Sequence, residues 1–475
     1  MFFTIDILVE FSNIEIKPNT ISYSNSIYYN NPISYMSILD NYIFYKEVKS
    51  NNKYDEVIKR MFMGDPLNPI IDNSFILNEG VANHNMYFFK DRYSNIKILG
   101  GQHCGISTWE SFKKDLYSNY HKKNIFIDTK KFNITMRGFE KIFDPLIACP
   151  YYANGLHLFE FDKNKFSKLK CLNNYLPILS GIHPGRYDGH YGYTDNKNIK
   201  NSRNGLTVYD SIGSVVFNSN KNLYFLYHRS NIGTGRRTIQ YTTSFDLINW
   251  SEYNLVNFDS NYNCFDSNIY YSNFYKIHNI YIAILPYIKR VNSNYNSIDN
   301  NLYYNLYYSY DCINYFLVGP ILVKNIKKLE HFEMAVNKPL IKNNIMYFYE
   351  RDNISKKLNI YLLKKYRFFY ITNLKNKEAH FKIKLQDCLN KYIYLNFTVE
   401  ELGYFLIELS DLNNNIIPGY SYKDFDKIYN NDEIKFIPKW NNKTFLPKNE
   451  LFINFKIFNS RFYTLKCKSI NNIYK

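Results

Sequence analysis

The densest group of side chains suited to binding chemistry is the stretch SGIHPGRYDGHYGYTD, Ser180–Asp195. Its glycines allow a ligand to approach the backbone closely, and its tyrosine rings can stack on the faces of a sugar. Arg186 and Asp188 can bond hydroxyl groups, with His183 and His190 beside them. We expect a binding loop here. The alternative is an ordered loop that only packs on a neighbouring sheet.

Metal and thiol chemistry are less well supported. The spacing of His183, Asp188 and His190 matches no strong metal-ligand pattern. In GGQHCG, His103 stands beside Cys104, but adjacency in sequence does not create a Cys–His dyad. We therefore predict no metal site and no cofactor. A Ca²⁺ ion held by Asp and Asn oxygen atoms stays open as an alternative.

A repeated heptapeptide indicates how the chain is organised. SFDLINW, Ser244–Trp250, returns as SYDCINY, Ser309–Tyr315, and EFDKNKF, Glu160–Phe166, is a weaker third copy. Short strand patterns flank each copy. We interpret the motif as a turn between outer strands of a propeller blade, in which Asp accepts backbone N–H bonds and the aromatic residue fills the gap between blades.

The spacing of the copies predicts the architecture. Units of about 65 residues with about four strands each predict a five-bladed β-propeller over residues 45–372, after N-terminal lead-in strands over 1–44. Residues 373–475 alternate as strands without the motif and predict a β-sandwich. The fold class is all-β, with short helices expected in loops over 52–61 and 108–120, where apolar residues recur at helical spacing.

One long stretch resembles the five-bladed propeller glycoside hydrolases of the arabinanase, levansucrase and invertase group. It is TVYDSIGSVVFNSNKNLYFLYHRSNIGTGRRTIQYTTSFDLINW. The tail IELSDLNNNIIPGYSYKDFDKI resembles the β-sandwich that closes many such chains. The resemblance spans most of the chain and is poor before residue 65. It implies a sugar site in the central funnel, built from carboxylates of different blades that act as acid, nucleophile or base, and stabiliser.

Four carboxylates match positions that the resemblance assigns to catalysis. Asp210 in VYDS is the strongest match, and Asp266 in CFDSNIY and Glu333 in HFEMAV match inner strands of the fourth and fifth blades. Glu79 in NEGVANHN stands where a first-blade carboxylate is expected, although the usual N-D-P context is absent and Asp65 in GDPLNP competes with it. Any one of them could instead cap a turn.

Two arginines near these positions are candidate substrate contacts. Arg229 and Arg237 flank the turn GTGRR, where they could pair with a funnel carboxylate, bind an anionic sugar substituent, or form a structural ion pair. We predict a glycoside hydrolase-like protein that acts on an oligo- or polysaccharide. The alternative is a propeller without catalysis that binds glycans or serves as a structural, virion-associated protein. An enzyme needs two carboxyl groups about 5–5.5 Å apart for retention or about 6.5–9.5 Å for inversion.

Charge and composition restrict the remaining classes. The net charge is +17, but no block of basic residues and no nucleic-acid motif is present, so we predict no nucleic-acid partner. The seven scattered cysteines predict buried thiols or a reducing compartment. MFFTIDILVEF does not read as a signal peptide, and no apolar run is long enough to span a membrane. The Asn-, Lys-, Ile- and Tyr-rich composition suits an A/T-rich genome, either that of a large DNA virus or that of an A/T-rich microbe.

Overall fold

The computed structural model describes most of the chain as β-strands. It covers residues 8–31, 33–48, 56–77, 87–101, 155–162, 165–172, 179–180, 212–232, 236–251, 253–259, 267–269, 271–277, 280–290, 298–325 and 332–469. Within these ranges no helix occurs. The all-β prediction is therefore confirmed for the described chain, in keeping with its many tyrosine, phenylalanine and isoleucine residues.

Five mostly antiparallel sheets follow one another along the chain. The first sheet holds β4 (Ile33–Leu39), β5 (Tyr42–Val48), β6 (Glu56–Phe62) and β7 (Ile70–Leu77). The second holds β8 (Tyr87–Lys90), β9 (Ile96–Gly101), β10 (Gly155–Asp162), β11 (Lys165–Cys171) and β12 (Leu179–Ser180). The third holds β13 (Ser214–Asn218), β14 (Leu223–Ile232), β15 (Arg236–Ser244) and β16 (Asn254–Leu255).

The fourth and fifth sheets have divided first strands. The fourth holds β17 (Asn257–Phe258), β18 (Ser267–Ile269), β19 (Phe274–Ile277), β20 (Ile280–Arg290), β21 (Ile298–Ser309) and β22 (Asn314–Asn325). The fifth holds β23 (Phe332–Met334), β24 (Leu340–Lys342), β25 (Ile345–Asp352), β26 (Lys357–Lys364) and an N-terminal strand, β3 (Ser22–Tyr28).

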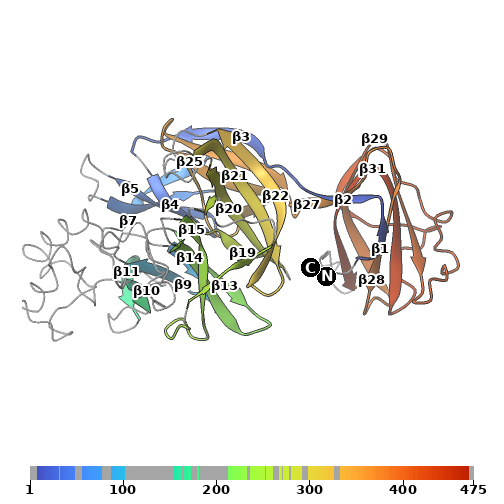
Figure 1. Ribbon diagram of the computed structural model, residues 1–475, viewed down its shortest axis with the longest axis horizontal. Coiled ribbons are helices and arrows are strands. Elements are labelled where there is room, and N and C mark those ends of the chain that lie inside the picture. Colours follow the sequence, from blue (N-terminus) through green and yellow to red (C-terminus); the bar gives the residue numbers. More distant parts are fainter. Residues whose placement is uncertain are drawn as a thin grey trace, which may run out of the picture.

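The first strands of these sheets meet around one axis. β4 contacts β8, β8 contacts β13, β13 contacts β19, and β23 contacts β4. The remaining junction is closed by Asn273, whose side-chain amide donates to the carbonyl of Ala335 over 3.3 Å. β4 and the end of β23 are joined by the backbone bonds Val336 N–H to Met36 O and Ile38 N–H to Val336 O. The sheets therefore form a ring, a β-propeller-like arrangement, on the left of Figure 1.

A strand replaces one of the two predicted helices. Residues 56–62 form β6 in the middle of the first sheet, between β5 and β7. Ile58 and Met61 are both buried, and the pairing of β6 with β7 shifts register between Lys59 and Met61. The pairing of β6 with β5 is unbroken, so Ile58 and Met61 face opposite sides of the sheet, and both sides are covered. Apolar residues on both faces of a strand imitate helical spacing, which is why the helix prediction was wrong. The second predicted helix, 108–120, lies outside the described residues.

The repeated heptapeptide is a turn, as predicted. Asp246 Oδ1 accepts the N–H groups of Ile248 (2.9 Å) and Asn249 (2.8 Å), and Asp311 Oδ1 accepts those of Ile313 and Asn314 (both 2.8 Å). Each copy follows the third strand of its sheet, β15 or β21. The weaker copy falls at the equivalent place between β10 and β11, with residues 163–164 outside the described chain.

The closing aromatic residue of the second copy joins two sheets, as predicted for a gap filler. Tyr315 is buried, and its hydroxyl lies 3.1 Å from the hydroxyl of Tyr227 in the third sheet. Its ring meets the ring of Phe274 edge to face at a centroid distance of 5.0 Å. Phe274 also stacks on Tyr227 at 3.9 Å. This aromatic cluster packs the third sheet against the fourth.

Both ends of the chain contribute to a separate seven-stranded sheet, which we call the terminal sheet (right side of Figure 1). It consists of β1 (Leu8–Ser12), β2 (Ile14–Pro18), β27 (Phe369–Asn373), β28 (Ala379–Leu385), β29 (Lys391–Ser410), β30 (Asn431–Phe436) and β31 (Leu451–Ser469). Phenylalanines form much of its core; Phe381, for example, stacks on Phe455 at a centroid distance of 4.6 Å.

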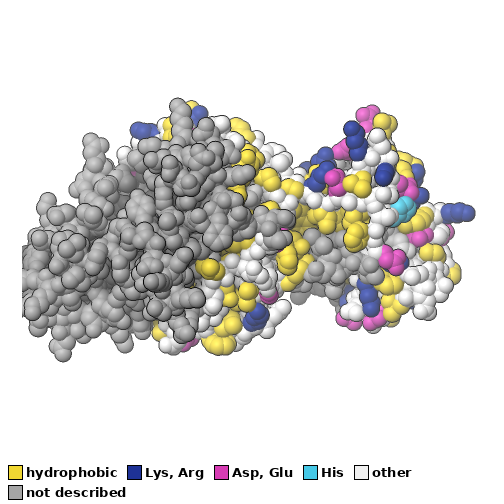
Figure 2. Space-filling view, in the orientation of Figure 1, with side chains coloured by type: hydrophobic (Ala, Val, Ile, Leu, Met, Phe, Trp, Pro, Cys, Tyr) yellow, Lys and Arg dark blue, Asp and Glu magenta, His cyan; other side chains and the backbone are white. Residues whose placement is uncertain are grey.

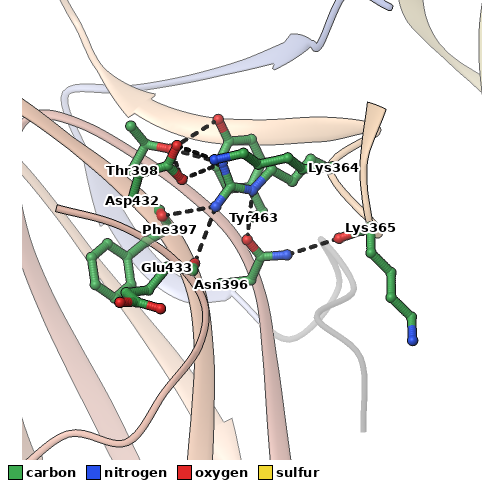
Figure 3. Close-up of polar contacts among 9 residues, drawn as sticks. Lys364, Lys365, Asn396, Phe397, Thr398, Asp432, Glu433 and Tyr463 are labelled. Atoms are coloured by element: carbon green, nitrogen blue, oxygen red, sulfur yellow. Dashed lines mark hydrogen bonds and ion pairs between the residues drawn. The ribbon is translucent and has the colours of Figure 1, made fainter. Parts of the chain in front are cut away.

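A buried arginine joins the ring to the terminal sheet. Arg367 lies between β26 and β27 and is 3% exposed. Its guanidinium donates to Asn396 Oδ1 (2.7 Å) and Thr398 Oγ1 (3.0 Å), and pairs with Asp432 Oδ1 at 2.6 Å. Asp432 also pairs with Lys364 at the end of β26 (Figure 3). The link between the two units is therefore anchored in β29 and β30.

The net positive charge does not gather into one visible patch. On the described part of the terminal sheet's visible face, Lys and Arg side chains alternate with Asp and Glu (Figure 2). Many are paired, such as Arg461 with Glu400 at 2.8 Å and Lys382 with Glu10 at 2.8 Å. Among the described residues, no helix has the length and apolar character needed to cross a membrane.

Candidate functional site

The first strands all run in the same direction along the axis. A cavity at one end of the ring is lined by Ile38–Asp40, Phe89–Lys90, Val215–Phe217, Phe274–Lys276 and Asn337–Ile341. These residues belong to or follow the first strands of the five sheets. The beginnings of the first strands therefore lie at the opposite end of the ring, which we call the entry mouth.

Glu333 is the one predicted catalytic carboxylate that lies within the described chain, in β23 at the entry mouth. It is 5% exposed. Its Oε1 accepts the N–H of Met36 at 3.1 Å, and its Oε2 accepts Nε of Arg351 at 2.8 Å and lies 2.8 Å from Nη2. Both oxygens are thus engaged, so Glu333 ties β4, β23 and β25 together.

Asp210, Glu79 and Asp266 lie outside the described residues, as do His183, Arg186, Asp188 and His190. Their positions in the chain can still be compared with the strands that follow. β13 begins at Ser214, β8 at Tyr87 and β18 at Ser267. Each predicted carboxylate thus precedes the first strand of a different sheet in the chain.

Arg229 lies on β14 and is fully buried. Since Ser214, the first residue of β13, pairs with Tyr227, Arg229 extends past the start of β13 at the entry mouth. Its neighbour His228 is also buried and meets the ring of Tyr253 edge to face at 5.1 Å. Burial lowers the pKa of His228 to about 3, so this imidazole stays neutral. Arg237 belongs to β15, opposite Asn231 in β14.

A second buried carboxylate, which the sequence analysis missed, lies near Glu333. Glu350 on β25 is 0% exposed. It accepts bonds from the hydroxyls of Tyr304 (2.8 Å) and Tyr361 (3.0 Å), and it pairs with Lys324. Burial and the charge of Glu350 raise the pKa of Tyr304, which keeps that hydroxyl a donor. Because Tyr304 and Lys324 come from the fourth sheet, the network fixes the fourth sheet to the fifth.

Glu47 is a third buried carboxylate near the entry mouth among the described residues. It lies on β5 opposite Ile33, the first residue of β4, and is 7% exposed. Its Oε1 accepts Lys59 Nζ at 2.7 Å and Asn31 Nδ2 at 3.3 Å. Glu47, Glu333 and Glu350 each have a cationic partner, as buried charges generally require.

Asp65, the alternative to Glu79 as first-blade carboxylate, does not lie on a first strand. It lies in the turn between β6 and β7, the third and fourth strands of the first sheet. Its Oδ1 accepts the N–H of Leu67 at 3.1 Å and its Oδ2 accepts Asn68 Nδ2 at 2.6 Å. This Asp-x-x-Asn turn matches those of Asp246 and Asp311, and its spacing in GDPLNP was the signal that could have revealed it.

The described residues offer no metal site. No group of three or more His, Cys, Asp or Glu side chains among them is arranged to hold an ion. The acidic groups at the entry mouth instead meet lysine or arginine. In this part of the chain the site therefore presents fixed ion pairs and aromatic hydroxyls.

Comparisons with known proteins leave the family open. No family model matches the chain, and no curated protein matches it in sequence. Among solved structures it is similar to an N-acetylgalactosamine deacetylase from F. plautii, with 10% identity over 95% of both chains and a TM-score of 0.35.

Two further similar structures are glycosidases. An exo-β-1,3-galactanase from Phanerochaete chrysosporium has 9% identity over 96% of this chain and 100% of that one, with a TM-score of 0.34. A family 43 arabinoxylan arabinofuranohydrolase from Bacillus subtilis has 8% identity over 95% and 96%, also with a TM-score of 0.34. Likeness at this level shows neither the family nor the activity of this chain.

Proposed function

We propose that this protein is a glycoside hydrolase-like protein that acts on carbohydrate at the entry mouth. The proposal includes a five-bladed propeller made from the five sheets. It assigns residues 45–372 to this propeller, apart from β27, which belongs to the terminal sheet, and adds β3 and β4 from the lead-in 1–44. Residues 373–475 would form a β-sandwich, joined by β1 and β2.

One observation carries the proposal. In the chain, Glu79, Asp210 and Asp266 precede the first strands of three different sheets, with Asp266 directly before β18, and Glu333 lies within β23, the first strand of another. Side chains at the starts of such strands converge on one mouth of a ring. Glycoside hydrolysis needs this convergence, because an acid and a nucleophile or base must flank the same bond. Asp210 and Asp266 are the proposed catalytic pair, with Glu79 as the third carboxylate.

Glu333 has a positioning role in this proposal. Because Arg351 and the Met36 N–H already occupy both of its oxygens, it holds the walls of the mouth in place instead of transferring a proton. Arg229 supplies positive charge beside the proposed carboxylates, and the loop that contains His183, Arg186, Asp188 and His190, with Arg237, supplies sugar contacts.

The test is a hydrolysis screen of the whole protein on aryl glycosides and polysaccharides, beside Asp210→Asn and Asp266→Asn. Asp65→Asn is the matched control, because Asp65 lies in an outer turn. We expect turnover that falls at least about a thousandfold in the first two variants and stays unchanged in the control. Turnover that survives in both Asp210→Asn and Asp266→Asn would contradict the assignment.

The second candidate function is glycan binding without catalysis. The observation that favours it is the pairing of every described buried carboxylate at the mouth with a cation. In that case no substrate is hydrolysed, and oligosaccharide binding measured by calorimetry survives Asp210→Asn but falls in Arg186→Ala.

A further inference from the structure

The end of the ring opposite the entry mouth contains a cavity that the proposed function does not use. Its volume is about 610 Å³, within the range of roughly 300–1,000 Å³ typical of small-molecule sites. All five sheets contribute to its wall, through residues that lie in or directly after their first strands. We call it the axial cavity.

The wall of the axial cavity is largely apolar and is held in a fixed shape. It includes the aromatic rings of Phe89, Phe217 and Tyr275. Asn337 has a positive φ of 73°, and its side-chain amide donates to the carbonyls of Phe88 (2.7 Å) and Ile38 (3.2 Å). These bonds fix the turn between β23 and β24 against the ends of β4 and β8. A flat apolar group would therefore meet a preformed surface.

The charged residues of the cavity are mainly cationic. Lys90 pairs with Asp40 at 2.6 Å, so these two charges offset each other. Lys276 donates to the neutral hydroxyl of Ser219 at 2.7 Å. In the part of the chain that the structure describes, neither Lys276 nor Lys338 forms an ion pair with a carboxylate. Two lysine charges thus remain at the cavity without an anionic counterpart from these residues.

We propose that the axial cavity binds a small organic anion with a flat apolar body and one strongly acidic group. The aromatic wall contacts the apolar body, and Lys276 and Lys338 attract the anionic group. Burial of the apolar body supplies most of the affinity, and the lysines select the charge. This site is independent of the carboxylates at the entry mouth.

A matched pair of fluorescent probes tests the proposal on the full chain. 8-Anilinonaphthalene-1-sulfonate carries an aromatic body and one sulfonate, and N-phenyl-1-naphthylamine has the same body without the charge. We expect one equivalent of the sulfonate to bind to the folded protein. Replacing both lysines (Lys276→Gln with Lys338→Gln) should weaken it roughly five- to tenfold, and binding of the neutral probe should change less than about twofold.

The control replaces two exposed lysines in the turn between β27 and β28, Lys375→Gln with Lys377→Gln, and should leave both affinities unchanged. A third variant, Val215→Trp, places a large ring at the cavity wall and should abolish binding of both probes. Circular dichroism and thermal unfolding establish that each variant is folded. The proposal is overturned if the sulfonate does not bind, if it binds with several equivalents, or if the double lysine variant leaves its affinity unchanged.

Discussion

Asp246 shows how a single side chain supports the turns of this fold. Burial opposes its ionisation, but the N–H and side-chain amide of Asn249, the N–H of Ile248 and the hydroxyl of Ser244 outweigh burial and lower its pKa to about 2. Because the carboxyl accepts all of these bonds, the turn after β15 depends on the charged form. Leu247 in the same turn has a positive φ of 70°, which the bonds hold in place.

We expect Asp246→Ala to lower the free energy of unfolding by about 1–2 kcal/mol, the usual cost of losing a capping side chain. A pKa below that of the unfolded chain means that the charge contributes stability above about pH 4, and that this contribution disappears as the pH falls towards 2. Because solvent screens this exposed charge, the contribution of ionised Asp246 to the free energy of unfolding is about 1 kcal/mol. Urea unfolding at pH 7 and pH 2.5 measures both effects. Asp246→Asn keeps an acceptor oxygen and should lose less; an equal loss would contradict this account.

His228 should make the protein sensitive to mild acid. Its pKa in the folded protein is lowered to about 3 by burial, whereas an unfolded histidine titrates near 6.5. The unfolded chain therefore binds a proton between these values that the folded chain does not. The contribution of neutral His228 to the free energy of unfolding should therefore be fully present above pH 6.5. Below that pH the free energy of unfolding should fall by up to about 1.4 kcal/mol per pH unit.

Calorimetry between pH 7.5 and 5 tests this effect, with His228→Phe as the comparison. Phenylalanine keeps the edge-to-face contact with Tyr253 and cannot be protonated. The variant should lose about one proton from the uptake that accompanies unfolding in this range. Identical proton uptake in the two proteins would show that His228 is not the group responsible.

At the scale of strands, the link between the ring and the terminal sheet depends on Arg367. Its partners come from β29 and β30, and its guanidinium lies 4.4 Å from the ring of Tyr463 on β31. Arg367→Met removes the charge but keeps most of the apolar stem. We expect a loss of about 3–5 kcal/mol, because Asp432 and the buried acceptor Asn396 lose their partner.

Differential scanning calorimetry should then show the terminal sheet melting separately from the ring, at a lower temperature. Arg461→Met is the matched control, since that arginine is 40% exposed in its pair with Glu400 and should cost less than about 1 kcal/mol. A single transition for Arg367→Met at the temperature of the unchanged protein would contradict the anchoring role.

The strands also show what the sequence can predict. The turns at Asp246 and Asp311 were predictable because their chemistry is local: an aspartate and the backbone amides two and three residues ahead. β6 was not, because apolar residues on both of its faces imitate helical spacing, and only its pairing with β5 and β7 buries both faces. The buried network of Glu350 was missed because its donors lie on three other strands, up to 46 residues away.

At the scale of the whole molecule, the N-terminal segment pairs with strands of both the terminal sheet and the ring. β1 pairs with β28 and β2 pairs with β27 in the terminal sheet. β3 then pairs with β26 as the outer strand of the fifth sheet, and β4 opens the first sheet. Composition and periodicity could not reveal this arrangement, since it joins residues more than 300 positions apart. One short segment thus completes the terminal sheet and joins the first sheet to the fifth.

Two N-terminal deletions separate these roles. Removal of residues 1–19 takes away β1 and β2, so it should destabilise the terminal sheet while the ring keeps β3. Removal of residues 1–30 also strips β3 from β26 and leaves a long strand edge unpaired, which favours aggregation. We expect the first variant to lose only the calorimetric transition of the terminal sheet, and the second to lose both transitions and to self-associate in analytical ultracentrifugation. Equal behaviour of the two deletions would mean that the ring does not need β3, and that the contacts between β4 and β23 hold the first sheet to the fifth without it.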